Sequence, residues 1–128
     1  MEKAYSIYLD ATKIGTTRFE YADVPMGVLH GKINFLNIES PYALFRNHCK
    51  RHKVQINEDE PMYKFIDTIV IHQLKVYFEN GIELTGWGAA ITGMDSEEYE
   101  IQFGGISPEL MQREFKHYYD EYFENETH

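Results

Sequence analysis

Two histidines, His48 and His52, lie four residues apart in the segment NHCKRHK, which spans residues 47–53. On a helix of about 3.6 residues per turn this spacing places both imidazoles on one face, where they are able to share one metal ion. The same spacing also arises when two histidines simply belong to the packed face of a helix. The segment therefore predicts either a metal or ligand site or a pair of partly buried, hydrogen-bonded histidines.

The other residues of this segment have simpler interpretations. Cys49 is the only cysteine of the chain, and as the neighbour of His48 it does not face that imidazole on a helix. We interpret it as a small apolar filler. Lys50, Arg51 and Lys53 fall on the opposite arc, where positive charge complements the end of a helix. They are too few to form a nucleic-acid site in an acidic protein.

A third histidine, His72, lies in the segment FIDTIVIHQLKVYF (residues 65–78), which is dense in β-branched and aromatic residues and predicts a strand. The pair Asn80-Gly81 that follows is typical of a two-residue hairpin turn, which would place His72 opposite Ala89. The returning strand contains the sequence GWGAA, whose small residues leave space for a packed helix or a ligand. As an alternative to a packed core, we predict a ligand pocket lined by His48, His52, His72 and Trp87.

The elements that position these residues follow from hydrophobic alternation and from helix caps. Strands are predicted at residues 3–10, 14–21, 28–36, 65–78, 82–92 and 99–103. Helices are predicted to begin at Ser40-Pro41 and Ser107-Pro108, because serine caps the first turn and proline is tolerated there, and to extend to about residues 53 and 123. The order βββαβββα predicts an α+β fold, with an antiparallel sheet and two helices packed on one face.

The two halves of the chain also match locally. The segments KINFLNIESPYAL (residues 32–44) and YEIQFGGISPELM (residues 99–111) align with one residue deleted. Either a pseudo-twofold repeat of residues 1–56 and 62–124 or the shared chemistry of two strand–turn–helix units explains this match. The alignment pairs His48 with Phe115, which favours a core position for His48. The length predicts one domain over residues 1–128.

The composition excludes several classes of function. The chain has 21 Asp and Glu against 12 Lys and Arg, a net charge of −9, which disfavours nucleic acid and anionic membranes as partners. No apolar run approaches the roughly 20 residues of a membrane span, and one cysteine forms no internal disulfide, so we expect a cytoplasmic protein. No P-loop, Rossmann fingerprint, nucleophile elbow or H-E-x-x-H is present. We therefore assign no catalytic residue and no cofactor, and do not favour an enzyme.

The ten tyrosines exceed what so small a domain buries, and tyrosines near acidic residues suit a protein–protein surface. The leading interpretation is thus a small acidic binding protein, neutralising or regulatory, that contacts another protein or a second copy of itself. Its size and charge are similar to those of bacterial toxin-immunity proteins, which is an analogy of composition only. The candidate contact residues are Tyr118, Tyr119, Tyr122, Glu97 and Glu98. The alternative is a small-ligand or metal-binding protein with its site around the three histidines; the leading interpretation includes no metal.

Overall fold

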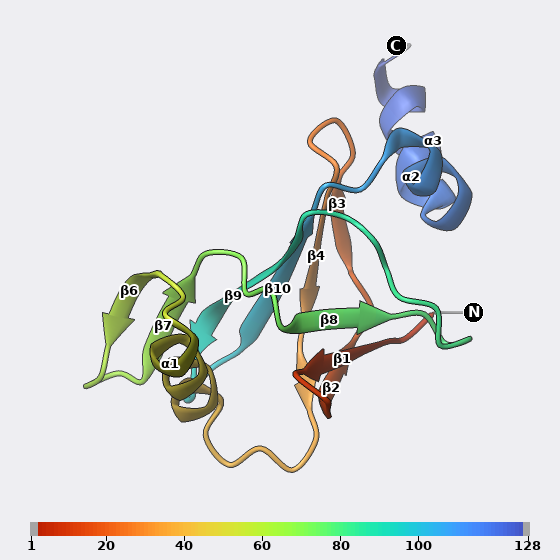
Figure 1. Ribbon diagram of the computed structural model, residues 1–128. Helices are drawn as coiled ribbons and strands as arrows, with labels where there is room; N and C mark the ends of the chain where they lie inside the picture. Colours follow the sequence, from red (N-terminus) through yellow and green to blue (C-terminus); the bar gives the residue numbers. More distant parts are fainter. Residues whose placement is uncertain (1–2, 127–128) are drawn as a thin grey trace.

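A computed structural model describes residues 3–126 and shows an α+β fold with antiparallel sheets, as predicted (Figure 1). The strands in this range are β1 (Tyr5–Leu9), β2 (Thr12–Thr17), β3 (Tyr21–Asp23), β4 (Val28–Lys32), β5 (Asn34–Phe35), β6 (Ile56–Glu60), β7 (Phe65–Thr68), β8 (Leu74–Tyr77), β9 (Gly88–Met94) and β10 (Tyr99–Gly104). The helices are α1 (Pro41–His52), α2 (Pro108–Glu114) and α3 (Lys116–Glu126). None of these helices combines the length and the apolar character needed to cross a membrane.

The strands form two sheets. One has the order β5-β2-β1-β8, and the other has the order β3-β4-β10-β9-β7-β6. Alternate residues of the strands point inward, as in β9 and β10, and the core is built from the inward faces of both sheets. β6, with the acidic sequence INEDE, forms outside the segments predicted as strands, and it occupies an edge of the larger sheet. Charged residues on an edge strand discourage pairing with other chains.

Two segments predicted as single strands each divide between the sheets. The predicted strand 65–78 becomes β7 in the larger sheet and β8 in the smaller one, where β8 pairs with β1. The predicted strand 28–36 likewise becomes β4 and β5, which pair with β10 and β2 respectively. Continuous hydrophobic patterns cross both breaks, so the sequence pattern does not mark the change of sheet.

The helices lie at two different places on the sheets. α1 packs against β7 and β9, whereas α2 and α3 follow the other end of β10 (Figure 1). The predicted arrangement of two helices on one face is therefore replaced by α1 at one end and by α2 and α3 at the other. The second predicted helix is also interrupted at Phe115, whose φ of −123° departs from helical geometry and separates α2 from α3.

The predicted internal repeat is not confirmed. Ser40 and Ser107 do cap their helices in the same way, since each side-chain oxygen accepts a hydrogen bond from the backbone three residues later. The strands that lead into these caps differ, because β5 pairs with β2 in one sheet and β10 pairs with β4 and β9 in the other. Residues 1, 2, 127 and 128 of the predicted ranges lie outside the described part of the chain.

The start of α1 is fixed by a carboxylate from the turn between β9 and β10. Asp95 accepts hydrogen bonds from the Ser40 hydroxyl at 2.5 Å, the Tyr42 backbone N–H at 2.9 Å and the Tyr99 hydroxyl at 2.8 Å. Burial alone raises the pKa of Asp95, but these hydrogen bonds outweigh it and hold the pKa below its ordinary value of 3.8. The helix that carries His48 is thus attached to the larger sheet.

Replacing Asp95 with alanine is expected to lower the free energy of unfolding by about 2–3 kcal/mol at neutral pH, because three donors lose a charged acceptor. A carboxylate with a depressed pKa stabilises the native state above its unfolded pKa and loses that contribution as the pH falls through its folded pKa. Urea unfolding should therefore show a difference between wild type and Asp95→Ala that shrinks below pH 3.8. The exposed neighbour provides the control, Ser96→Ala, which should cost less than about 0.5 kcal/mol. A pH-independent difference would contradict the assignment.

Candidate metal site

The histidines of α1 meet a carboxylate that comes from another part of the chain. Asp10, in the turn between β1 and β2, lies beside His48 and His52, and each residue offers one ligand atom within 4.8 Å of the others. Helical spacing explains the histidine pair, whose ring centroids are 4.3 Å apart. The pairing of β1 with β8 brings the Asp10 turn to the same place. We call these three residues the Asp10/His48/His52 cluster.

His48 is buried and held through one ring nitrogen. It is 1% exposed, and its Nε2 lies 3.1 Å from the Oε1 atom of Gln73. An amide oxygen only accepts, so Nε2 carries the hydrogen in this bond. In a neutral imidazole the other nitrogen, Nδ1, then has a free lone pair. A metal-binding histidine is typically oriented in this way, by donating its second N–H to a carbonyl oxygen.

The Nδ1 atom of His48 makes no hydrogen bond within the described part of the chain, although it is fully buried. It faces the Oδ2 atom of Asp10 at 3.5 Å, too far for a good hydrogen bond. A lone pair directed at a carboxylate is unfavourable unless a proton or a cation lies between them. Ligand atoms at about 2.0–2.1 Å from a tetrahedral zinc ion are roughly 3.3–3.4 Å apart, which is close to the observed separation.

Asp10 is held by its backbone, while its carboxylate remains accessible. It adopts a left-handed conformation with φ 55°, which aspartate tolerates better than most residues. Its backbone N–H donates a hydrogen bond to the Gln73 carbonyl at 2.9 Å. The side chain is 48% exposed, and His52 is exposed as well. The cluster therefore has a buried nitrogen at its base and two side chains that face solvent.

The Asn80-Gly81 turn has a different register from the predicted one. Tyr77 is bridged to Glu83, and Gly81 adopts a positive φ of 86°. The loop thus holds three residues, 79–81, where a two-residue turn was predicted. Because side chains alternate along a strand, a shift of one residue changes which side chains face a given partner.

His72 consequently lies outside the cluster. Ile71, rather than His72, is bridged to Ala89, and Ile71 is buried whereas His72 is exposed. His72 and Trp87 line a separate hollow of about 130 Å³, and Trp87 is 77% exposed. The structure therefore brings the two helical histidines together and places the other two predicted pocket residues elsewhere.

The predicted partner-binding residues do not gather on one surface. The exposed Glu97 and Glu98 belong to the turn before β10, next to α1, whereas the three tyrosines belong to α3, which follows the other end of β10. Tyr118 is engaged internally, since its hydroxyl donates a hydrogen bond to the Phe19 carbonyl. Binding of a partner protein through these residues stays a prediction.

Cys49 has no role in the cluster. It is fully buried, and burial raises the pKa of its thiol to about 11. A thiol with a raised pKa remains protonated at neutral pH and is a poor nucleophile and metal ligand. This agrees with its interpretation as an apolar filler.

A comparison of the chain with protein-family models, with curated proteins and with solved structures finds no match.

Proposed function

We propose that the protein binds a divalent transition-metal ion of the zinc class through Asp10, His48 and His52. The observation that supports this most strongly is the buried Nδ1 of His48, which has no hydrogen-bond partner among the described residues and points at a carboxylate. Two imidazoles and one carboxylate form a ligand set that suits zinc, and also cobalt or nickel. Of the predicted alternatives, this one has specific support from the geometry.

The ligand set leaves room for a further ligand. Structural zinc sites are usually closed by four protein side chains, whereas sites with three protein ligands keep one position for water or for an incoming molecule. Asp10 and His52 are exposed, so the open position faces solvent. We infer that the ion exchanges readily with the medium.

The proposal is tested by titrating Zn²⁺ and Co²⁺ into the chelator-treated full chain by calorimetry at neutral pH. One ion should bind per chain, and Co²⁺ should give the absorption bands of a low-coordinate site. Asp10→Asn and His52→Ala should each weaken Zn²⁺ binding by about 100-fold or more, at least as much as the loss of an outer-shell partner. Asparagine also tolerates the left-handed backbone of residue 10, so the turn should be retained.

His72→Ala is the matched control, because it removes an exposed histidine that lies outside the cluster. Its Zn²⁺ affinity should equal that of the wild type. Equal losses in His72→Ala and His52→Ala would show adventitious binding to surface histidines. Absence of Zn²⁺ binding would equally overturn the proposal.

A further inference from the structure

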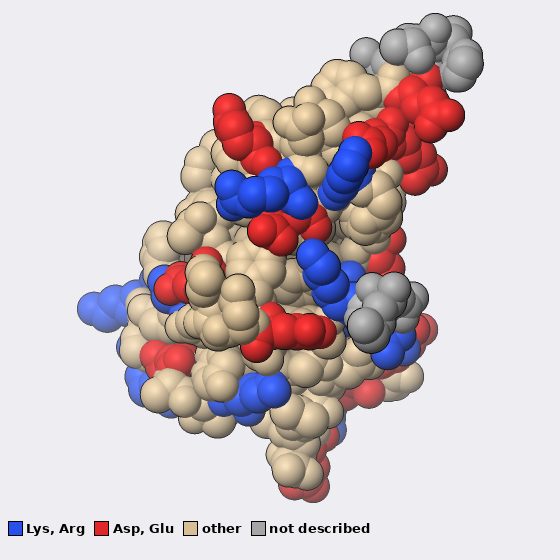
Figure 2. All heavy atoms as spheres, turned by 90° about the vertical axis from the view of Figure 1, so that its right-hand side faces the viewer, with Lys and Arg blue, Asp and Glu red and all other residues tan. Residues whose placement is uncertain are grey.

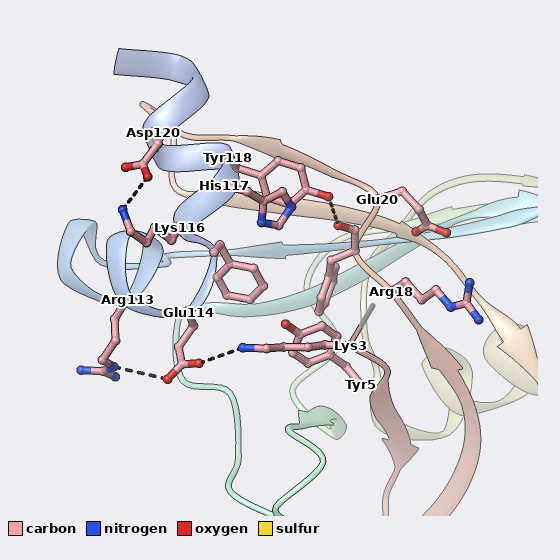
Figure 3. Close-up of a pocket in the computed structure, with 12 residues that line it drawn as sticks. Lys3, Tyr5, Arg18, Glu20, Arg113, Glu114, Lys116, His117, Tyr118 and Asp120 are labelled. Carbon is pink, nitrogen blue, oxygen red and sulfur yellow. Dashed lines mark hydrogen bonds and ion pairs between the residues drawn. The ribbon is translucent and has the colours of Figure 1, made fainter. Parts of the chain in front are cut away.

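A second site lies at the other end of the molecule. A hollow of about 800 Å³ opens between the start of β1, the segment that follows β2, and the helices α2 and α3 (Figure 3). Ligand sites in proteins typically have volumes of about 300–1,000 Å³. No residue of the Asp10/His48/His52 cluster lines this hollow, so the two sites are separate.

Aromatic rings form the base of the hollow. Tyr5, Phe19 and Phe115 pack together with ring centroids 5.2–6.4 Å apart, and each is at most 3% exposed. The hydroxyl of Tyr118 donates a hydrogen bond to the Phe19 carbonyl at 2.6 Å, which attaches α3 to this base. These three rings are buried beneath the hollow, whereas the rings of His117 and Tyr118, whose centroids are 3.8 Å apart, line it and stay at least partly exposed. Exposed rings of this kind offer an apolar surface to a flat or apolar ligand.

The rim of the hollow is more positive than the protein as a whole. Its charged lining residues are Lys3, Arg18, Arg113, Lys116, Glu20, Glu114 and Asp120. Four cations minus three carboxylates leave one positive charge, in a chain whose net charge is −9. Figure 2 shows this face, where Lys and Arg side chains lie beside acidic ones near α2 and α3. An anion is therefore better accommodated here than on the surrounding acidic surface.

Glu114 is the centre of this charge pattern. Its carboxylate is shared by two cations, the Lys3 ammonium at 3.6 Å and the Arg113 guanidinium at 3.4 Å (Figure 3). Lys116 pairs instead with Asp120 at 2.5 Å along α3. One carboxylate balances the charge of only one cation. Lys3 and Arg113 together therefore retain one positive charge, which a second anion is able to neutralise.

Tyr5 contributes a hydrogen-bond donor to the same hollow. Burial, followed by the nearby carboxylate of Glu114, raises the pKa of the Tyr5 hydroxyl to about 12. The hydroxyl therefore stays protonated at neutral pH. A neutral hydroxyl beside cations complements an anionic group without repelling it.

We propose that this hollow binds a small organic anion, with a carboxylate or phosphate group on an aromatic or apolar body. The anionic group lies next to Lys3 and Arg113, and the body rests against the rings of His117 and Tyr118. Glu114 competes with the anionic group of the ligand, because its carboxylate already pairs with the same two cations.

The proposal is tested with four probes in chelator-treated protein, so that metal binding plays no part. The probes are naphthoate, naphthyl phosphate, the neutral naphthylmethanol and inorganic phosphate, and binding is followed by two-dimensional NMR of the full chain. One or both of the naphthyl anions should bind and shift the amides around residues 113–118. The tighter of the two identifies the preferred anionic group. Naphthylmethanol and inorganic phosphate should bind at least about threefold more weakly, because each lacks one half of the interaction.

Substitutions of Glu114 and of its two cations should change the affinity for the naphthyl anion in opposite directions. Glu114→Gln should tighten binding of the naphthyl anion by about threefold, whereas Lys3→Gln combined with Arg113→Gln should weaken it by at least as much. Lys50→Gln, which removes an exposed cation from α1 far from the lining residues, is the control and should leave the affinity unchanged. Equal binding of the neutral probe, weaker binding in Glu114→Gln, or no anion binding would overturn the proposal.

Discussion

Phe115→Ala should lower the free energy of unfolding by about 3–5 kcal/mol, the typical effect of removing a fully buried aromatic side chain. Phe115 is 2% exposed, and its ring lies 5.8 Å from that of Tyr5 and 6.4 Å from that of Phe19. It also stands at the break between α2 and α3, where its carbonyl accepts hydrogen bonds from the first turn of α3. Truncation leaves a cavity at the position where the helices join the sheets.

Urea unfolding followed by circular dichroism measures this effect. Phe123→Ala is the matched control, since the ring of Phe123 is on α3 but is 44% exposed. It should cost less than about 1 kcal/mol. Similar losses in both variants would show that α3 is stabilised by its surface aromatic residues, and not by the base of the hollow.

The local elements of this fold are well predicted by local chemistry. Ser40 and Ser107 cap their helices as expected, and residues 99–103 form a strand as predicted. These features depend on neighbours within a few residues, and so they appear directly in the sequence. The break of the second helix at Phe115 is different, because no glycine or proline in this part of the sequence marks it.

The arrangement of the sheets is less predictable. Residues 65–78 are uniformly rich in strand formers, yet the chain leaves one sheet after Thr68 and enters the other at Leu74. Which sheet a strand joins depends on packing between distant segments. The added residue in the 79–81 loop then changes the register, because both two- and three-residue hairpin loops are compatible with Asn80-Gly81.

The candidate metal site also combines residues that local sequence identifies with residues that only the folded chain brings together. His48 and His52 are identifiable from helical spacing alone. Asp10 and Gln73 are not, because they reach His48 only through the pairing of β1 with β8. His72, the third histidine of the predicted pocket, is the immediate neighbour of Gln73, so the prediction included the segment that contacts His48 but not the residue that makes the contact.

Gly93→Ala is the second change expected to have a large effect, about 3 kcal/mol of destabilisation, because the new methyl group has no space. A Cβ atom on Gly93 would lie 2.3 Å from the Glu98 carbonyl oxygen, 2.6 Å from the Tyr99 Cα and 2.7 Å from the Tyr99 ring. The first two contacts are with backbone, which cannot move aside without separating β9 from β10.

Gly104→Ala is the matched control for this substitution in the neighbouring strand. Its Cβ atom would make one ordinary contact, 3.6 Å from the Trp87 ring, so the change should alter stability by less than about 0.5 kcal/mol. Comparing the two variants by thermal and urea unfolding separates the steric effect from the general effect of placing alanine in a strand. Equal stabilities would contradict the close packing of Gly93 against Tyr99.

The consequence of Gly93→Ala should extend to the proposed metal site. Displacement of the Tyr99 ring removes its hydroxyl from Asp95, and Asp95 fixes the first turn of α1. Because His48 and His52 lie on the last turns of that helix, a looser start weakens the position of both ligands relative to the Asp10 turn. Zn²⁺ affinity should therefore fall in Gly93→Ala and remain unchanged in Gly104→Ala, when both are measured at a temperature where each variant is folded. Unchanged affinity in Gly93→Ala would show that α1 is positioned independently of the β9–β10 turn.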